Sequence, residues 1–333
     1  MSRILVTGAT GRVAGVLASR LAADHDVVAV ARFSDPAARQ GLEALGVECV
    51  VADLGDHALA GVPDDAEILL HFAVSFSSRW DTALAVNAES LGHLVDRQRS
   101  LERVLHCSSM GVYAASPRTH AEDAPLGDSN AAMMPTYSIT KIAAESMARY
   151  LAQARGVPTT IARLGSPYGD HGGFPGFHLL SILAGDPVTL HTTEPNRFNL
   201  IHEDDLLPSL WLMLDAASAP ATVVNWADPE PVAAEEWCAE LARLTGRELT
   251  ITRADAAPPP GVMDVSRLTA LGYQPSVAWR DGFRSMVAAL TPSALAAGTL
   301  ADAVRRQADR LADETALTVT CRIDDGLPKL PTA

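Results

Sequence analysis

The stretch at residues 4–15, which reads ILVTGATGRVAG, constrains the fold of this chain more than any other. Ile4, Leu5 and Val6 predict a short buried strand, and residues 13–23 predict an apolar helix. Between them, Gly8 and Gly11 permit a tight turn and a close backbone approach that a Cβ would hinder. A strand, a glycine turn and a helix together can hold a phosphate at the N–H groups of the helix N-terminus. A plain strand-to-helix connection also uses glycine, so other parts of the chain are needed to distinguish a phosphate-binding turn from such a connection.

Strand-like and helix-like patterns alternate as far as about residue 163. Strands are expected over residues 4–6, 27–31, 47–51, 67–71, 104–107 and 159–162, with helices over 13–23, 37–45, 82–99 and 135–153. This alternation implies right-handed crossovers and a parallel sheet covered on both faces, which is an α/β doubly wound, Rossmann-like fold. Ligands of such sheets bind beyond the carboxyl ends of the strands, so residues directly after each strand are candidate site residues.

Composition and charge exclude several classes of function. The 333 residues carry a net charge of −14 without a basic cluster, which argues against a nucleic-acid or anionic-membrane partner. No apolar run reaches the roughly 18 residues of a membrane span, and no leader precedes the first strand. The 4 cysteines are scattered, with Cys49 and Cys107 in apolar strands where core thiols are expected. We expect a cytoplasmic protein, and no metal site.

Two arginines favour a phosphorylated dinucleotide. The second strand is followed by Arg32, and no acid occurs before Asp35. A guanidinium binds phosphate in bidentate fashion, whereas an acid at this point would bind ribose hydroxyls and repel a 2′-phosphate. Arg12, inside the glycine turn, can reach the same phosphate. NADP is therefore expected over NAD, the alternative being two solvated surface arginines.

Residues after the third and fourth strands are candidate contacts of the same cofactor. Asp53, followed by Leu54, can accept a hydrogen bond from an adenine amino group, or can equally cap a helix N-terminus. After the fourth strand, Phe72 and Ala73 are expected beneath the ribose and nicotinamide. His71 has no second ligand at metal-binding spacing, so a packed or hydrogen-bonded histidine is the preferred interpretation.

A tyrosine and a lysine on one expected helix carry the chemistry. Tyr137 and Lys141 are four residues apart and share one helix face. A free tyrosine has a pKa of about 10, and a nearby ammonium and an oxidised nicotinamide would favour its phenolate. Ser109, at the end of the fifth strand, can hold a substrate oxygen together with Tyr137, and Lys141 can also bind the nicotinamide ribose. Alone, this spacing is common on surface helices; with the glycine turn and the serine, it indicates an active site.

These motifs together resemble the extended short-chain dehydrogenase/reductase family, also called the NAD-dependent epimerase/dehydratase family. The resemblance is carried by TGATG at residues 7–11, SSMGVY at 108–113 and YSITK at 137–141, and it covers roughly residues 1–290. It implies a hydride-transferring fold with Ser109, Tyr137 and Lys141 as the catalytic set, the tyrosine being the acid/base. The expected cofactor-binding residues are Gly8, Thr10, Gly11, Arg12, Val13, Arg32, Asp53, Leu54, Phe72, Ala73 and Lys141.

The chain departs from the family pattern at positions that bear on the substrate. Ser166 stands where an asparagine of the nucleotide-sugar enzymes contacts the substrate diphosphate, which weakens a nucleotide-sugar substrate without excluding it. Met110 and Gly111 replace the acidic pair of the sugar 4,6-dehydratases, so that dehydration is rejected. Arg197 lies near where family members bind a substrate phosphate, or is a surface arginine. Met110, Ser166 and Arg197 are the candidate substrate contacts, and the loops 170–177 and 191–198 are expected to face the cleft.

The resemblance also implies a division into domains. Residues 1–165, with a return segment at about 198–225, are expected to form the dinucleotide-binding domain. Residues 166–197 and 226–292 are expected to form a smaller substrate-binding lobe, and residues 293–333 an extension of unreadable role. The expected assembly is a homodimer through the helices around 82–99 and 135–153.

The sequence leaves three candidate functions for this chain. The first is an NADP(H)-dependent oxidoreductase that interconverts a carbonyl and a secondary alcohol on a small organic substrate. The second is an NAD-dependent sugar or nucleotide-sugar epimerase that holds its cofactor tightly. The third is a cofactor-sensing protein without turnover, which the presence of both Tyr137 and Lys141 disfavours.

Overall fold

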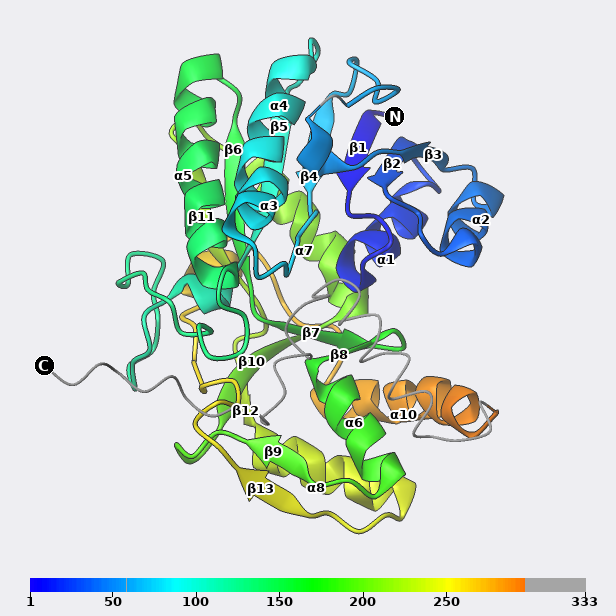
Figure 1. Ribbon diagram of the computed structural model, residues 1–333, viewed down its shortest axis with the longest axis vertical. Coiled ribbons are helices and arrows are strands. Elements are labelled where there is room, and N and C mark those ends of the chain that lie inside the picture. Colours follow the sequence, from blue (N-terminus) through cyan, green and yellow to red (C-terminus); the bar gives the residue numbers. More distant parts are fainter. Residues whose placement is uncertain (58, 297–333) are drawn as a thin grey trace, which may run out of the picture.

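The computed structural model describes residues 1–57 and 59–296, which form two lobes (Figure 1). The larger lobe contains a parallel sheet with the strand order β11-β6-β5-β4-β1-β2-β3. Its strands are β1 (Arg3–Thr7), β2 (Asp26–Ala31), β3 (Glu48–Val51), β4 (Ile68–His71), β5 (Arg103–Ser109), β6 (Thr159–Leu164) and β11 (Thr222–Trp226). The doubly wound α/β fold predicted from the alternation of strands and helices is confirmed.

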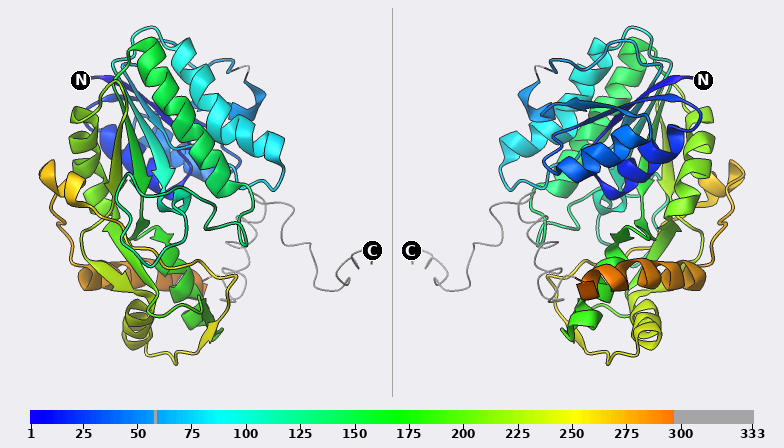
Figure 2. Two further views of the ribbon diagram at one scale, coloured as in Figure 1. Left: turned by 90° about the vertical axis from the view of Figure 1, so that its left-hand side faces the viewer. Right: turned by 90° about the vertical axis from the view of Figure 1, so that its right-hand side faces the viewer.

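Helices cover both faces of this sheet because its strands present apolar side chains alternately to each face. In β1, Ile4 and Val6 pack into one core and Leu5 into the opposite one. The first face is covered by α1 (Arg12–Leu21), α2 (Pro36–Ala44) and α7 (Glu203–Asp215), and the opposite face by α4 (Ser90–Arg97) and α5 (Tyr137–Arg155). The short helix α3 (Trp80–Leu84) packs against α5. Helices α4 and α5 lie side by side (Figure 2).

Helix boundaries differ from expectation at two places. The helix predicted over 82–99 runs from Trp80 to Arg97 and contains a π-helical turn, η2 (Ala85–Glu89), where Asn87 is buried. The Asn87 amide binds both the backbone N–H and the C=O of Ser75, as well as the Thr140 hydroxyl of α5. Helix α5 begins at Tyr137 rather than at residue 135, because Pro135 and Thr136 lie outside its first turn. The short 3-10 turns are η1 (Leu54–Asp56) and η3 (Met110–Val112).

The smaller lobe contains a four-stranded sheet in the order β12-β10-β7-β8 and the pair β13-β9. Its strands are β7 (Ser166–Gly169), β8 (Gly172–Gly173), β9 (Val188–Leu190), β10 (Arg197–His202), β12 (Pro231–Ala233) and β13 (Ile251–Arg253). Its core includes α6 (Phe174–Ala184), α8 (Ala234–Thr245) and α10 (Trp279–Ala296), whereas α9 (Ser266–Ala270) contacts β11 and α7. Of the predicted extension 293–333, residues 297–333 lie outside the described part.

Candidate active site

The glycine turn between β1 and α1 is shaped for a ligand that approaches the backbone closely. Gly8 has a φ of +69°, and a Cβ there would lie 2.9 Å from the backbone N and Cα of Ala73. Gly11 caps α1 without a side-chain acceptor for the first-turn N–H groups. An acceptor supplied by a phosphate group would fit this helix end. The turn therefore fits the pyrophosphate of a dinucleotide.

The segment after β4 is tied to the glycine turn. The Thr7 hydroxyl accepts hydrogen bonds from the N–H groups of Phe72 (3.1 Å) and Ala73 (3.2 Å). His71 is fully buried, with its ring nitrogens 3.0 Å from His106 Nδ1 and 3.1 Å from Ser90 Oγ. Burial lowers the pKa of His71 to about 3, so the ring is neutral. This is the hydrogen-bonded histidine that the sequence predicts.

The two arginines predicted to read a 2′-phosphate lie in different surroundings. Arg32 is exposed directly after β2, two residues beyond Val30, whose carbonyl accepts the Gly8 N–H at 2.9 Å. Arg12 instead faces the smaller lobe. Its Nε donates to the carbonyl of His171 at 3.1 Å, and its guanidinium lies 4.9 Å from the centre of the Phe177 ring. Arg12 is thus engaged by the smaller lobe, and a 2′-phosphate contact of either arginine stays a prediction.

Asp53 acts as a cap in this structure. Its carboxylate accepts a hydrogen bond from Gly55 N–H at 2.9 Å at the start of η1. The side chain is exposed, and Leu54 after it is buried. One of the two interpretations of Asp53, the helix cap, is therefore observed, and the adenine contact stays a prediction.

Ser109, Tyr137 and Lys141 line one cleft between the two lobes. The Ser109 hydroxyl accepts a hydrogen bond from Gly111 N–H at 3.0 Å. The ring of Tyr137 stacks on Phe76, with ring centres 5.3 Å apart. Lys141 is buried, and its Nζ donates to the carbonyl of Cys107 at 2.9 Å. A hydroxyl, a phenol and an ammonium thus converge from β5 and α5.

The acidity of these groups is set mainly by burial. Burial raises the pKa of Tyr137 to about 12, and the hydrogen bond with Ser109 acts in the opposite direction. Burial likewise lowers the pKa of Lys141, and it raises that of the Cys107 thiol to about 11. The shift of Tyr137 is opposite to the one expected from a nearby ammonium, because desolvation of the phenolate dominates and the Lys141 ammonium donates to a carbonyl. The phenol is accordingly a proton donor at neutral pH.

A buried ion pair supports the catalytic strand and helix from behind. Glu145, one turn after Lys141, accepts two hydrogen bonds from Arg163, at 2.8 Å from Nε and 2.7 Å from Nη2. The same carboxylate accepts from the Ser108 hydroxyl at 2.7 Å and from Arg149 Nη2 at 2.9 Å. The pair therefore joins α5 to β5 and β6.

The predicted substrate contacts do not all lie in the cleft. Met110 and Ser166 line it, whereas the exposed side chain of Arg197 does not. Of the loop 191–198, which was expected to face the cleft, Phe198 alone lines it. His178 of α6 is buried and accepts a hydrogen bond from Trp237 Nε1 at 2.8 Å.

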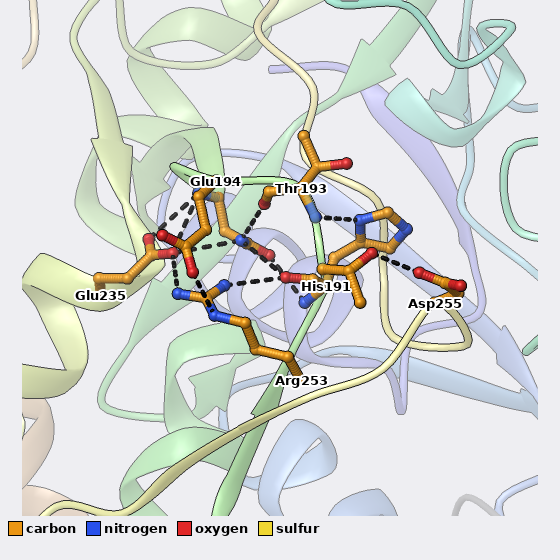
Figure 3. Close-up of polar contacts among 8 residues, drawn as sticks. His191, Thr193, Glu194, Glu235, Arg253 and Asp255 are labelled. Atoms are coloured by element: carbon orange, nitrogen blue, oxygen red, sulfur yellow. Dashed lines mark hydrogen bonds and ion pairs between the residues drawn. The ribbon is translucent and has the colours of Figure 1, made fainter.

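A polar network holds the rest of that loop in the smaller lobe (Figure 3). Arg253 donates to the His191 carbonyl at 2.9 Å and to Glu235 at 3.1 Å, and it forms an ion pair with Glu194 at 2.5 Å. Asn196 accepts from His191 N–H at 2.9 Å. These bonds turn the loop onto α8 and β13, and explain why the expectation that it faces the cleft is wrong for residues 191–197.

The cleft has a volume of about 800 Å³ and extends from the glycine turn to the smaller lobe. Phe174 and Phe177 of the loop 170–177, which was expected to face the cleft, line it. Further lining residues that the sequence did not indicate are Phe76, Met133, Met134, Pro258, Pro259, Pro260 and Gly261. Residues 258–261 contribute one continuous segment of this lining. Gly261 N–H donates to the Arg197 carbonyl at 3.0 Å, which holds this segment against β10.

No cluster of three or more His, Cys, Asp or Glu side chains in the described ranges could hold a metal ion. None of the described helices is long and apolar enough to cross a bilayer.

A family model and several relatives match the chain. The model described as the NAD dependent epimerase/dehydratase family matches residues 4–227. A 2′-dehydrokanamycin reductase of Streptomyces kanamyceticus is 31% identical over 257 residues, which is 74% of this chain and 67% of that protein. An L-arabinose 1-dehydrogenase (NAD(P)(+)) of Haloferax volcanii is 27% identical over 179 residues, or 50% of this chain and 67% of that protein.

Solved structures share the fold. A UDP-glucuronic acid 4-epimerase from Bacillus cereus, in complex with NAD, has a TM-score of 0.75 at 20% sequence identity. The match covers 87% of this chain and 99% of that chain. At this identity the likeness concerns the fold alone.

Proposed function

Because the chain belongs to the NAD dependent epimerase/dehydratase family, we propose that it is an oxidoreductase that interconverts a carbonyl and a secondary alcohol. The family makes it an NAD(P)-dependent enzyme of the extended short-chain dehydrogenase/reductase type. The observation that carries the proposal is the convergence of Ser109, Tyr137 and Lys141 on a cleft that begins at the glycine turn.

Each residue of this set has a separate task in the reduction direction. Nicotinamide, when bound, supplies the hydride. Ser109 Oγ donates a hydrogen bond to the carbonyl oxygen and polarises it. Tyr137, which the raised pKa keeps protonated, gives its phenolic proton to the same oxygen. Lys141 binds the cofactor ribose. With its ammonium beside this ribose, Lys141 also lowers the free energy needed to form the Tyr137 phenolate.

Replacing Tyr137 by Phe tests the proton donor. Turnover should fall at least a hundredfold, the low end of what general acid catalysis contributes, while the affinity for NADPH changes less than twofold. Initial rates with a panel of aldehydes and ketones and a fluorescence titration of NADPH measure the two quantities. Ser109→Ala should reduce the same rates and keep cofactor binding. Activity retained in Tyr137→Phe would require another acid.

We propose NADP(H) as the cofactor, on the basis of Arg32. Arg32 is exposed directly after β2, and the residues between the end of β2 and Asp35 include no carboxylate. Arg32→Ala should weaken NADPH binding by about 1–3 kcal/mol, the scale of a charged hydrogen bond, and leave NADH binding nearly unchanged. Isothermal titration with both cofactors measures this difference. Equal losses for NADPH and NADH would overturn the assignment of Arg32.

The second candidate is an NAD-dependent epimerase, favoured by the fold shared with the Bacillus cereus epimerase. An epimerase keeps its cofactor through the cycle, because the hydride returns to the substrate. Protein purified without added nucleotide distinguishes the two functions. Stoichiometric NAD retained through gel filtration would favour the epimerase, and net NADPH consumption with a carbonyl substrate favours the reductase.

For the assembly and the remaining site residues, the sequence expectations continue as proposals. We propose a homodimer through α4 and α5, where Ile139 and Tyr150 of α5 are exposed. Thr10 and Val13 of the glycine turn, Leu54 after β3, and Phe72 and Ala73 after β4 are proposed cofactor contacts. Sedimentation velocity of the wild type and of Tyr150→Glu tests the dimer.

A further inference from the structure

The substrate end of the cleft is uncharged over its described lining. None of the residues that line the cleft is an aspartate or a glutamate, and its fixed cations are Arg12 and Lys141. Lys141 follows Tyr137 on α5 in the part we propose for the cofactor. Arg12 begins α1 at the glycine turn, and its guanidinium is engaged by the His171 carbonyl and the Phe177 ring. Burial lowers the pKa of the His120 ring and raises that of the Tyr113 phenol, so both are neutral at neutral pH.

Apolar side chains surround the position of the reacting carbonyl. The ring of Phe76 stacks directly on Tyr137. Met110 follows Ser109 and packs against the opposite wall, since a Cβ on Gly261 would lie 3.0 Å from Met110 Cε. Further walls come from Met133, Met134, Phe174 and Phe198. Methionine and phenylalanine give an adaptable apolar surface, which suits a bulky hydrocarbon group.

The few polar groups among these walls are already engaged or offer no charge. Ser129 Oγ donates to the Gly111 carbonyl at 3.2 Å. The Asn130 amide lies against Gly111, where a Cβ would come within 2.2 Å of its Nδ2. A single neutral amide does not offset the cost of removing an ionised group from water, which amounts to several kcal/mol per unpaired charge.

From this wall chemistry we propose that the substrate is a neutral carbonyl compound, or the corresponding alcohol, whose bulk beside the reacting carbon is apolar. The assignment rests on the proposed function and narrows it. It separates the chain from enzymes of nucleoside-diphosphate sugars, whose substrates carry two or more negative charges, and from enzymes of polycationic aminoglycosides. A nucleoside-diphosphate sugar would need cations at this end of the cleft to pair with its phosphates, and an aminoglycoside would need carboxylates to pair with its ammonium groups.

Three aryl methyl ketones that differ in the charge at the para position test the charge preference. Acetophenone is the neutral probe, 4-acetylbenzoate the anionic one, and 4-acetyl-N,N,N-trimethylanilinium the cationic one. With saturating NADPH, kcat/KM for acetophenone should exceed that for each charged ketone at least tenfold. Equal or higher values for either charged ketone, or for a keto sugar linked to a nucleoside diphosphate, would overturn the inference.

A variant pair links the preference to the wall. Met134→Lys introduces a cation into the cleft, so the ratio of kcat/KM for acetophenone to that for 4-acetylbenzoate should fall at least fivefold. Leu45→Lys makes the same change of net charge at the exposed end of α2, outside the cleft, and should leave the ratio as in the wild type. A ratio that moves equally in both variants would contradict the role of the wall.

Binding measured without turnover separates this inference from the proposed function. Tyr137→Phe saturated with NADPH is titrated with acetophenone, 4-acetylbenzoate and UDP-glucose in a calorimeter. Preferential binding of acetophenone supports the neutral pocket even if the wild type reduces none of the ketones, a result that would overturn the reductase instead. Preferential binding of UDP-glucose or 4-acetylbenzoate would overturn the neutral pocket while leaving carbonyl reduction intact.

Discussion

The buried ion pair behind the active site offers a sharp test of how the catalytic helix is held. Glu145 and Arg163 have side chains that are 0% and 1% exposed, and the carboxylate accepts hydrogen bonds from three partners. Removing one member of such a pair leaves an uncompensated buried charge, which costs about 3–5 kcal/mol. Glu145→Gln keeps the shape and removes the charge, so the free energy of unfolding should fall by about that amount.

Two further variants separate the charge from the packing. In Arg149→Ala the Glu145 carboxylate loses an arginine that is 40% exposed, and the loss should be at most about 1 kcal/mol. In the double variant Glu145→Leu with Arg163→Met both charges are removed, so it should be more stable than Glu145→Gln. Urea unfolding, followed by tryptophan fluorescence and circular dichroism, measures all three.

The same variants report on catalysis. Ser108 binds Glu145 directly, and Ser109 and Lys141 lie one residue and one helical turn away from this contact. A Glu145→Gln protein that folds should therefore lose kcat while KM for the ketone changes less. A loss of stability below 1 kcal/mol, or a double variant less stable than Glu145→Gln, would refute the description of the pair as a buried charge that needs its partner.

Two more predictions concern stability. Burial raises the pKa of Asp228 from 3.8 to about 7, so the folded protein holds a proton that the unfolded chain releases, and stability should fall as the pH rises from about 4 to about 7. Asp228→Asn should flatten the dependence of Tm on pH between about 4 and about 7 in scanning calorimetry; an unchanged slope would contradict the shift. Gly8→Ala should cost about 1–3 kcal/mol and weaken NADPH binding, because its Cβ meets the backbone of Ala73. Gly41→Ala in α2 has open space and should be neutral or stabilising; equal losses would refute the steric argument.

The framework of the larger lobe could be predicted because its signals are local. Apolar strands and amphipathic helices alternate with short turns, and the parallel order follows from the crossovers between them. The same local patterns predicted that Gly8 and Ser109 lie at strand ends and Tyr137 on a helix, and all three border the cleft.

The walls of the cleft could not be predicted because they depend on distant contacts. Pro258–Gly261 reaches the site through a hydrogen bond to Arg197, more than sixty residues earlier in the chain. The loop at His191 turns away because Arg253 binds its carbonyl. Burial raises the pKa of Tyr137, and sequence spacing shows the neighbouring ammonium but not this loss of water around the phenol.

Arg12 has a consequence for the energetics of binding. It begins the helix that faces the proposed cofactor phosphates, and the same guanidinium contacts His171 and Phe177 of the smaller lobe. Cofactor binding and the position of the smaller lobe therefore both depend on the Arg12 side chain. Equilibria that share a group are linked, and the linkage is reciprocal. If NADPH tightens ketone binding by some factor, the ketone must tighten NADPH binding by the same factor, and Arg12→Ala should bring both factors toward one.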